Sequence, residues 1–126
     1  MKQNLPKKTH FERIENRTGE GMPDVYLCIN GVPVWLEVKI VKNNRVSLSK
    51  SQIAWHSSHF RCKGVSFFLL HDPSTSDLFL FGADKAIELL GSRIDDLRPA
   101  ALYIGVMRGW VESLRPAAGA LWSEAM

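Results

Sequence analysis

Apolar and polar residues alternate along residues 25–29 and 32–40, and Asn30-Gly31 lies between these two segments. Asn-Gly in such a position is the strongest short-range signal for a β-hairpin with a two-residue type I′ turn. Because side chains alternate between the faces of a strand, one face of this hairpin is almost purely aliphatic. It consists of Val25, Leu27, Ile29, Val32, Val34, Leu36, Val38 and Ile40.

The other face of the predicted hairpin brings two acids and a lysine together. Counting outward from the turn sets Asp24 opposite Glu37, and Lys39 follows on the same face. Such a non-hydrogen-bonded pair has Cα atoms about 4.5 Å apart, and its carboxylates repel by roughly 4 kcal/mol at an effective dielectric near 20. Lys39 offsets part of this repulsion, and Mg²⁺ or Mn²⁺ would offset more because these ions prefer hard oxygen ligands. The alternative is a solvated sheet face, but Tyr26 and Trp35 share it.

Capping boxes predict two helices. Thr9 and Glu12 predict a short helix through about Arg17, and Ser49 and Gln52 predict a longer one. The second helix should end at about residue 62, where Lys63-Gly64 follows.

The rest of the pattern completes a mixed α/β order. Continuous apolar residues predict a strand at 65–71 that is buried on both faces, and residues 77–81 predict another. Asp84 should cap a helix through Leu90, while residues 100–126 fit one or two short helices that the pattern does not place. The order helix, strand, strand, helix, strand, strand, helix predicts a mixed sheet flanked by helices.

Length and composition fit one soluble domain. The chain has 126 residues, of which 45% are hydrophobic, and this is enough for a sizeable core. We expect a core at about 9–91 and a C-terminal extension at 92–126. No apolar run approaches the ~20 residues of a membrane span, and the basic N-terminus lacks the apolar segment of a secretory signal. Cys28 and Cys62 are too few for a zinc site or a disulfide framework, which favours a reduced cytoplasmic setting, although a single bridge between them stays open.

Charge is concentrated in the half that carries the acidic pair. Residues 1–63 contain 11 Lys and Arg against 5 Asp and Glu, whereas residues 64–126 contain 5 against 8. A basic surface beside a site indicates an anionic partner, and nucleic acid is the common one. The alternative is ordinary short-range clustering of charge.

Pro23-Asp24 followed by Glu37-Val38-Lys39 resembles the signature of the PD-(D/E)XK nuclease superfamily, with Val38 at the variable position. Together with the glycine turn and Ser49-Lys50-Ser51-Gln52, the chain is similar to small phage-type members, the VRR-NUC and Holliday-junction-resolvase-like nucleases. The resemblance covers roughly residues 9–82. It implies a restriction-endonuclease-like fold with an αβββαβ-type core, and a Mg²⁺- or Mn²⁺-dependent DNA endonuclease that selects branched or single-stranded DNA.

The resemblance also implies roles for particular residues. Asp24, Glu37 and the Val38 backbone carbonyl would bind the metal, and Lys39 would orient or deprotonate the attacking water or stabilise the phosphate. Similar nucleases carry a further acid upstream, for which we favour Glu15 over Glu12 and Glu20. Gln52 resembles their helix glutamine, but its alternative role is the capping box with Ser49.

Basic side chains near the motif are candidate contacts to the DNA backbone. These nucleic-acid-binding candidates are Lys42, Arg45, Lys50, His56, Arg61 and Lys63. The resemblance further implies a homodimer, which acts in the cytoplasm, or in the host cytoplasm if the chain is phage-encoded. Two alternatives stay open, namely a nucleic-acid-binding module of the same fold that no longer cleaves, and an interaction protein that carries the motif by chance.

Overall fold

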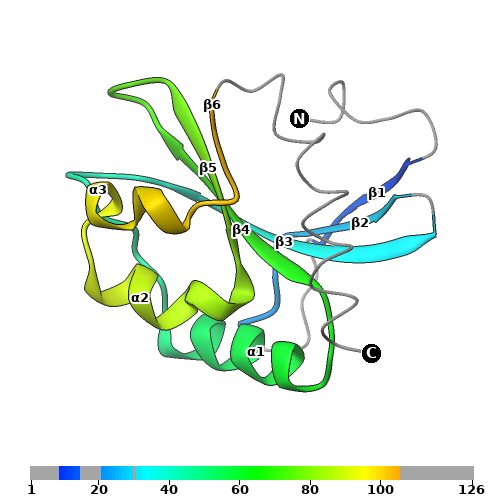
Figure 1. The fold of residues 1–126 in the computed structure, drawn as a ribbon. Coiled ribbons are helices and arrows are strands. Elements are labelled where there is room, and N and C mark those ends of the chain that lie inside the picture. The colour runs from blue at the N-terminus through cyan, green and yellow to red at the C-terminus, as the bar shows by residue number, and fades with distance from the viewer. Residues whose placement is uncertain (1–8, 15–20, 30, 106–126) are drawn as a thin grey trace.

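The computed structural model describes residues 9–14, 21–29 and 31–105, and within this part six strands form one mixed sheet in the order β1-β2-β3-β4-β5-β6 (Figure 1). The strands are β1 Thr9–Arg13, β2 Val25–Ile29, β3 Val32–Ile40, β4 Ser66–Asp72, β5 Asp77–Gly82 and β6 Tyr103–Gly105. The helices are α1 Lys50–Arg61, α2 Ala86–Gly91 and α3 Ile94–Leu97, with 3₁₀ turns at Ala83–Lys85 and Arg98–Ala100.

The hairpin of β2 and β3 has the register that the sequence predicts. Ile29 faces Val32, and the pairing continues without a bulge to Val25 opposite Leu36. Gly31 has a φ of +84°, which is the left-handed conformation that a tight hairpin turn requires and glycine adopts without strain.

Helix α1 connects β3 to β4, and these two strands are parallel, whereas all other neighbouring pairs of the sheet are antiparallel. The order β1-β2-β3-α1-β4 corresponds to the βββαβ part of the predicted αβββαβ-type core. The mixed α/β fold class is therefore confirmed. The crossover places α1 over the face of β3 that carries Glu37.

The sheet has an apolar core on each face. On the face where α1, α2 and α3 gather (Figure 1), the buried cluster consists of Val41, Val46, Leu48, Phe68, Leu70, Phe79, Phe81, Ala86, Leu89 and Ile94. On the opposite face, the aliphatic side of the hairpin joins β4 and β5 in a cluster of Val25, Leu27, Ile29, Val34, Leu36, Val65, Phe67, Leu69, Leu78 and Leu80. Strand β4 supplies both clusters, so the prediction that it is buried on both faces is confirmed.

The predicted helix through residues 9–17 is wrong for its first part, because residues 9–13 form strand β1. Phe11 pairs with Leu27 and packs against the aliphatic cluster. Extended pairing with β2 satisfies the backbone and partly buries this ring, and these tertiary gains outweigh the local preference of the capping box. Glu12 therefore has no capping role, and residues 15–17 lie outside the described residues.

The C-terminal half differs from expectation in two further places. Asp84 does not cap a helix with its side chain, because it lies within the 3₁₀ turn that precedes α2. Part of the extension after residue 91 joins the core, since α3 contributes Ile94 to the helix-side cluster and β6 extends the sheet next to β5. Among the described residues, no helix is long and apolar enough to cross a membrane.

Candidate active site

Asp24 lies at the open end of the hairpin, immediately before β2. Its backbone carbonyl accepts a hydrogen bond from the Ile14 amide at 2.8 Å, which ties it to the end of β1. Its side-chain Oδ2 accepts a hydrogen bond from the Val38 amide at 3.2 Å. Because the N–H and carbonyl of one strand residue point toward the same neighbour, the Val38 carbonyl also lies on the Asp24 side of β3.

Glu37 is the acid on β3 and its side chain is fully buried. The Gln52 amide Nε2 lies 3.5 Å from Glu37 Oε2, and His56 Nε2 lies 3.5 Å from Glu37 Oε1. Gln52 and His56 are one turn apart on α1, so they reach the same side of the sheet. Helix α1 therefore contacts the carboxylate of Glu37 from the helix-covered face of the sheet.

His56 is fully buried between Glu37 and β4. Its Nδ1 lies 2.9 Å from Ser66 Oγ, so that Ser66, His56 and Glu37 form a buried polar chain. Burial, together with the smaller effect of the neighbouring His59, lowers the pKa of His56 to about 4, although Asp24 acts in the opposite direction. The imidazole is therefore neutral at pH 7. This placement corrects the expectation that His56 contacts nucleic acid, because its side chain does not reach the surface.

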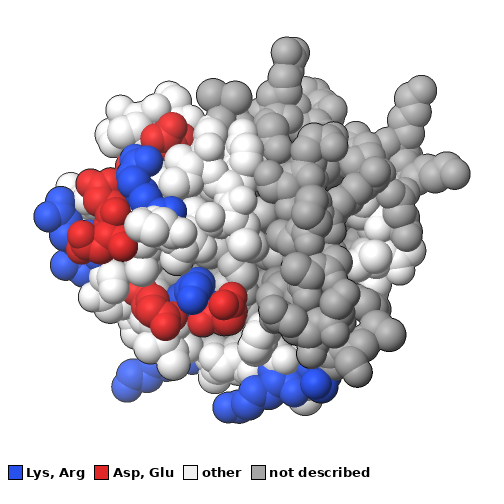
Figure 2. Space-filling view, in the orientation of Figure 1, with Lys and Arg blue, Asp and Glu red and all other residues white. Residues whose placement is uncertain are grey.

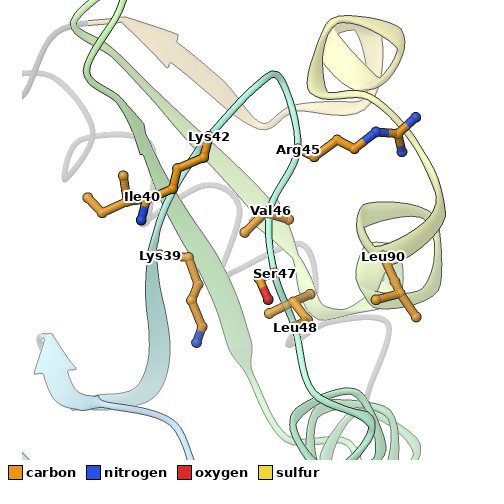
Figure 3. Close-up of a pocket in the computed structure, with 8 residues that line it drawn as sticks. All are labelled: Lys39, Ile40, Lys42, Arg45, Val46, Ser47, Leu48 and Leu90. Atoms are coloured by element: carbon orange, nitrogen blue, oxygen red, sulfur yellow. The ribbon is translucent and has the colours of Figure 1, made fainter.

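Lys39 follows Glu37 on the same face of β3 and is partly exposed. It lines a hollow of about 530 Å³ with Lys42, Arg45 and Ser47 among other residues. In Figure 3, Lys39 and Lys42 lie at one wall of this hollow, and the side chain of Arg45 extends away from them. Of the two further cationic side chains from the segment that follows β3, Lys42 therefore lies on the wall that carries Lys39, and Arg45 does not.

The donor set fits a hard divalent cation. Asp24 and Glu37 supply two carboxylates and Val38 a backbone carbonyl near the open end of the hairpin, and Mg²⁺ is usually bound by one or two carboxylates together with water and substrate phosphates. The described residues contain no group of three or more His, Cys, Asp and Glu side chains arranged for a metal. The favoured third acid, Glu15, and the alternative Glu20 lie outside the described residues. Glu12 lies on β1, is exposed, and is 3.6 Å from His10 Nε2.

The remaining DNA-contact candidates surround α1. Lys50 begins the helix, Arg61 ends it and Lys63 follows it, and all three are exposed. Lys and Arg gather at the lower edge of Figure 2, where Figure 1 places α1. Helix α1 itself contains no acidic residue, and the nearby acid Asp84 lines a hollow with Ser57 and Arg61 of the helix.

Sequence reasoning missed two features of the site. One is the buried chain from Ser66 through His56 to Glu37, for which the spacing of Gln52 and His56 on one helix face was the available signal. The other is the way Gln52 combines two roles, since it completes the capping box with Ser49 and also contacts Glu37. Capping and site contact were expected as alternatives, but the geometry allows both.

No protein-family model matches the sequence, and no curated protein matches it significantly. Among solved structures, the chain is similar to Hjc of Archaeoglobus fulgidus, a Holliday junction resolvase from an archaeal hyperthermophile, with 16% identity and a TM-score of 0.48. The similarity covers 60% of this chain and 64% of that one, which is less than two thirds of its length. Function must therefore follow from the site itself rather than from this likeness.

Proposed function

We propose that the protein is a divalent-metal-dependent DNA endonuclease of the PD-(D/E)XK type. It would hydrolyse phosphodiester bonds, with a preference for branched or single-stranded DNA. The observation that supports this proposal is the position of three residues at the open end of one hairpin: Asp24 immediately before β2, and Glu37 and Lys39 two residues apart on β3. The Val38 amide contacts Asp24, and Glu37 is buried beneath α1.

Each residue has a role that its position supports. Asp24, Glu37 and the Val38 carbonyl would hold Mg²⁺ or Mn²⁺. When bound, such a cation supplies a nucleophilic water and stabilises the charge of the leaving oxygen. Lys39 would orient the attacking water or neutralise charge on the phosphate. Gln52 and His56 keep the Glu37 carboxylate in place, which matters because small displacements of positioning groups cost large factors in rate.

Positive charge around the site would bind the DNA backbone. Lys42 and Arg45 line the hollow beside Lys39, and the ends of α1 carry Lys50, Arg61 and Lys63. Phosphate contacts of this kind give affinity and salt dependence without reading sequence. By the same resemblance we expect a homodimer that acts in the cytoplasm, or in the host cytoplasm if the chain is phage-encoded.

The test is cleavage of defined DNA. Supercoiled plasmid, single strands and four-way junctions are incubated with the full chain in Mg²⁺, Mn²⁺ or EDTA. We expect cleavage that requires metal and falls at least about 100-fold in Lys39→Ala, in line with losses on removal of one electrostatic stabiliser. Lys85→Ala is the matched control, because Lys85 pairs with Asp84 away from the site.

Two results would contradict the proposal. Retarded but intact DNA in every metal would favour the inactive binding module. Cleavage that persists in EDTA, or that Lys39→Ala retains in full, would separate any activity from this site.

A further inference from the structure

Five aromatic side chains run as a continuous row from the sheet to helix α1. The row is His10, Tyr26, Trp35, Trp55 and His59. Neighbouring ring centroids are 6.1 Å apart between His10 and Tyr26, and 5.0 Å apart between Tyr26 and Trp35. The row continues at 5.9 Å from Trp35 to Trp55, and Trp55 stacks on His59 at 4.6 Å with an interplanar angle of 22°. Four elements, β1, β2, β3 and α1, thus contribute to one aromatic surface.

This row lies at the surface and belongs to neither apolar core. His10 is exposed, the other four rings are half-buried, and none of the five contributes to either buried cluster. Trp55 and His59 line a hollow of about 540 Å³ together with the small side chains of Ser51, Ala54, Ser58 and Cys62. Hollows of a few hundred Å³ accept small ligands, so a nucleobase fits the space beside Trp55.

The row adjoins the acidic site. Trp35 precedes Glu37 by two residues on the same face of β3, about 7 Å along the strand. Trp55 follows Gln52 and precedes His56, the two α1 residues that contact Glu37. A strand that lies along the row would therefore pass close to Asp24 and Glu37.

The charges at the α1 end of the row favour an anionic occupant, whereas Glu12 lies beside His10 at the other end. Helix α1 has no acidic residue, and Lys50, Arg61 and Lys63 are exposed at its two ends. Aromatic rings interleaved with cations form the platform on which single-stranded nucleic acids bind, because every base has a π-face while the cations follow the phosphates. Intact duplex keeps its base faces stacked inside, so it would offer this row no ring to stack on.

We propose that this aromatic row stacks on the unpaired bases of a single DNA strand and directs that strand to the acidic site. The inference rests on the proposed function and deepens it, since it assigns the preference for DNA with unpaired bases to particular rings. Single strands, and branch points that carry unpaired bases, then bind more tightly than duplex because their bases contact the row in addition to the phosphate contacts.

The test separates base contacts from phosphate contacts. The full chain is titrated, in EDTA so that no cleavage occurs, with a fluorescent single-stranded oligonucleotide and with an oligonucleotide of equal length that carries abasic sites. We expect the base-carrying strand to bind at least about fivefold more tightly, the lower bound for stacking on one base. Trp55→Ala should reduce this preference, whereas Trp55→Phe should keep part of it.

Two control variants complete the test. Phe60→Ala removes an exposed aromatic ring of α1 outside the row and should leave the preference unchanged. Arg61→Ala should weaken the binding of both oligonucleotides by the same factor, because the substitution would remove a phosphate contact only.

Equal affinity of the wild-type chain for the two strands would overturn the inference, and so would a preference that survives in folded Trp55→Ala. The wild-type comparison decides the matter if that variant does not fold. Binding is measured in EDTA and is therefore independent of the cleavage assay. A base preference in the binding assay without metal-dependent cleavage of any DNA would contradict the proposed function and leave this inference standing. Metal-dependent cleavage without any base preference would overturn this inference and leave the proposed function standing.

Discussion

At the scale of single residues, the site depends on burying an acid and keeping its neighbour neutral. Glu37 and His56 are both fully buried, and an ionised group in such a place needs polar partners to offset the loss of water. Ser66 and Gln52 supply some of these contacts. The neutral state of His56 is therefore coupled to the folding of the protein.

Stability should fall in mild acid because His56 resists protonation in the folded state. Its folded pKa is about 4, below the ordinary value near 6.5, so between these values the unfolded chain binds a proton that the folded chain does not. The stabilisation is complete above pH 6.5 and is lost as the pH falls toward 4, by about 3 kcal/mol at 1.36 kcal/mol per pKa unit. Urea unfolding of the metal-free protein at several pH values measures this loss.

The slope of the unfolding free energy against pH, compared between variants, isolates the contribution of His56. His56→Gln should show a shallower fall between pH 6.5 and 4, whereas His10→Gln, at an exposed position, should follow the wild type. A wild-type stability that is flat over this range, or the same slope in His56→Gln, would contradict the expectation.

Gly21 lies in the loop before Asp24, where its backbone closely approaches the first turn of α1. Its φ is +81°, and a Cβ there would overlap the Ser51 carbonyl oxygen. Gly21→Ala should therefore lower the free energy of unfolding by more than the about 1 kcal/mol typical of a left-handed position alone. Gly31→Ala is the matched control, because Gly31 has a φ of +84° but nothing within 4 Å of the added atom. Thermal melts in which the two variants lose the same amount of Tm would argue against this close approach.

At the scale of elements, predictability depends on how local the determining contacts are. The hairpin of β2 and β3 was predicted to the residue, because an Asn-Gly turn and the alternation beside it set the register. The strand β1 was mistaken for a helix, because its partner lies across a loop and the local Thr9 and Glu12 signal pointed elsewhere. The acids on the hairpin could therefore be predicted, whereas the contacts of Glu37 with α1 required the crossover between β3 and β4.

Helix α1 links folding and site through its first turn. Ser49 Oγ accepts from the Gln52 amide and Gln52 Oε1 accepts from the Ser49 amide, while Gln52 Nε2 faces Glu37. Ser49→Ala and Gln52→Ala should each cost about 1 kcal/mol of stability through the lost cap. Only Gln52→Ala should also slow cleavage, because it alone loses the contact with the acid. Urea titrations and single-turnover rates on the same preparations separate the two effects, and equal rates in both variants would mean that the glutamine serves the cap alone.

At the scale of the whole molecule, the proposed metal site predicts that metal binding and folding stability are coupled. Asp24 and Glu37 lie near the open end of a hairpin whose other face builds the core. The repulsion expected between two such carboxylates would act on a structural element, and a bound cation should relieve it. A ligand that binds only the folded state at ten times its Kd adds about 1.4 kcal/mol. For a chain of 126 residues this gain raises Tm by roughly 5 °C.

Mg²⁺ and Mn²⁺ should therefore raise Tm by an amount that grows with the logarithm of the metal concentration above the Kd, and the shift should depend on the acids of the hairpin. Asp24→Asn and Glu37→Gln should abolish the shift, because each removes a charged oxygen ligand. Glu88→Gln, at an exposed acid of α2, should retain it and so exclude a general effect of ionic strength. Equal shifts in all four proteins would place the ion elsewhere. A wild-type Tm that neither ion moves would mean that the paired carboxylates tolerate each other without a cation, and the hydrolytic role would lose its physical basis.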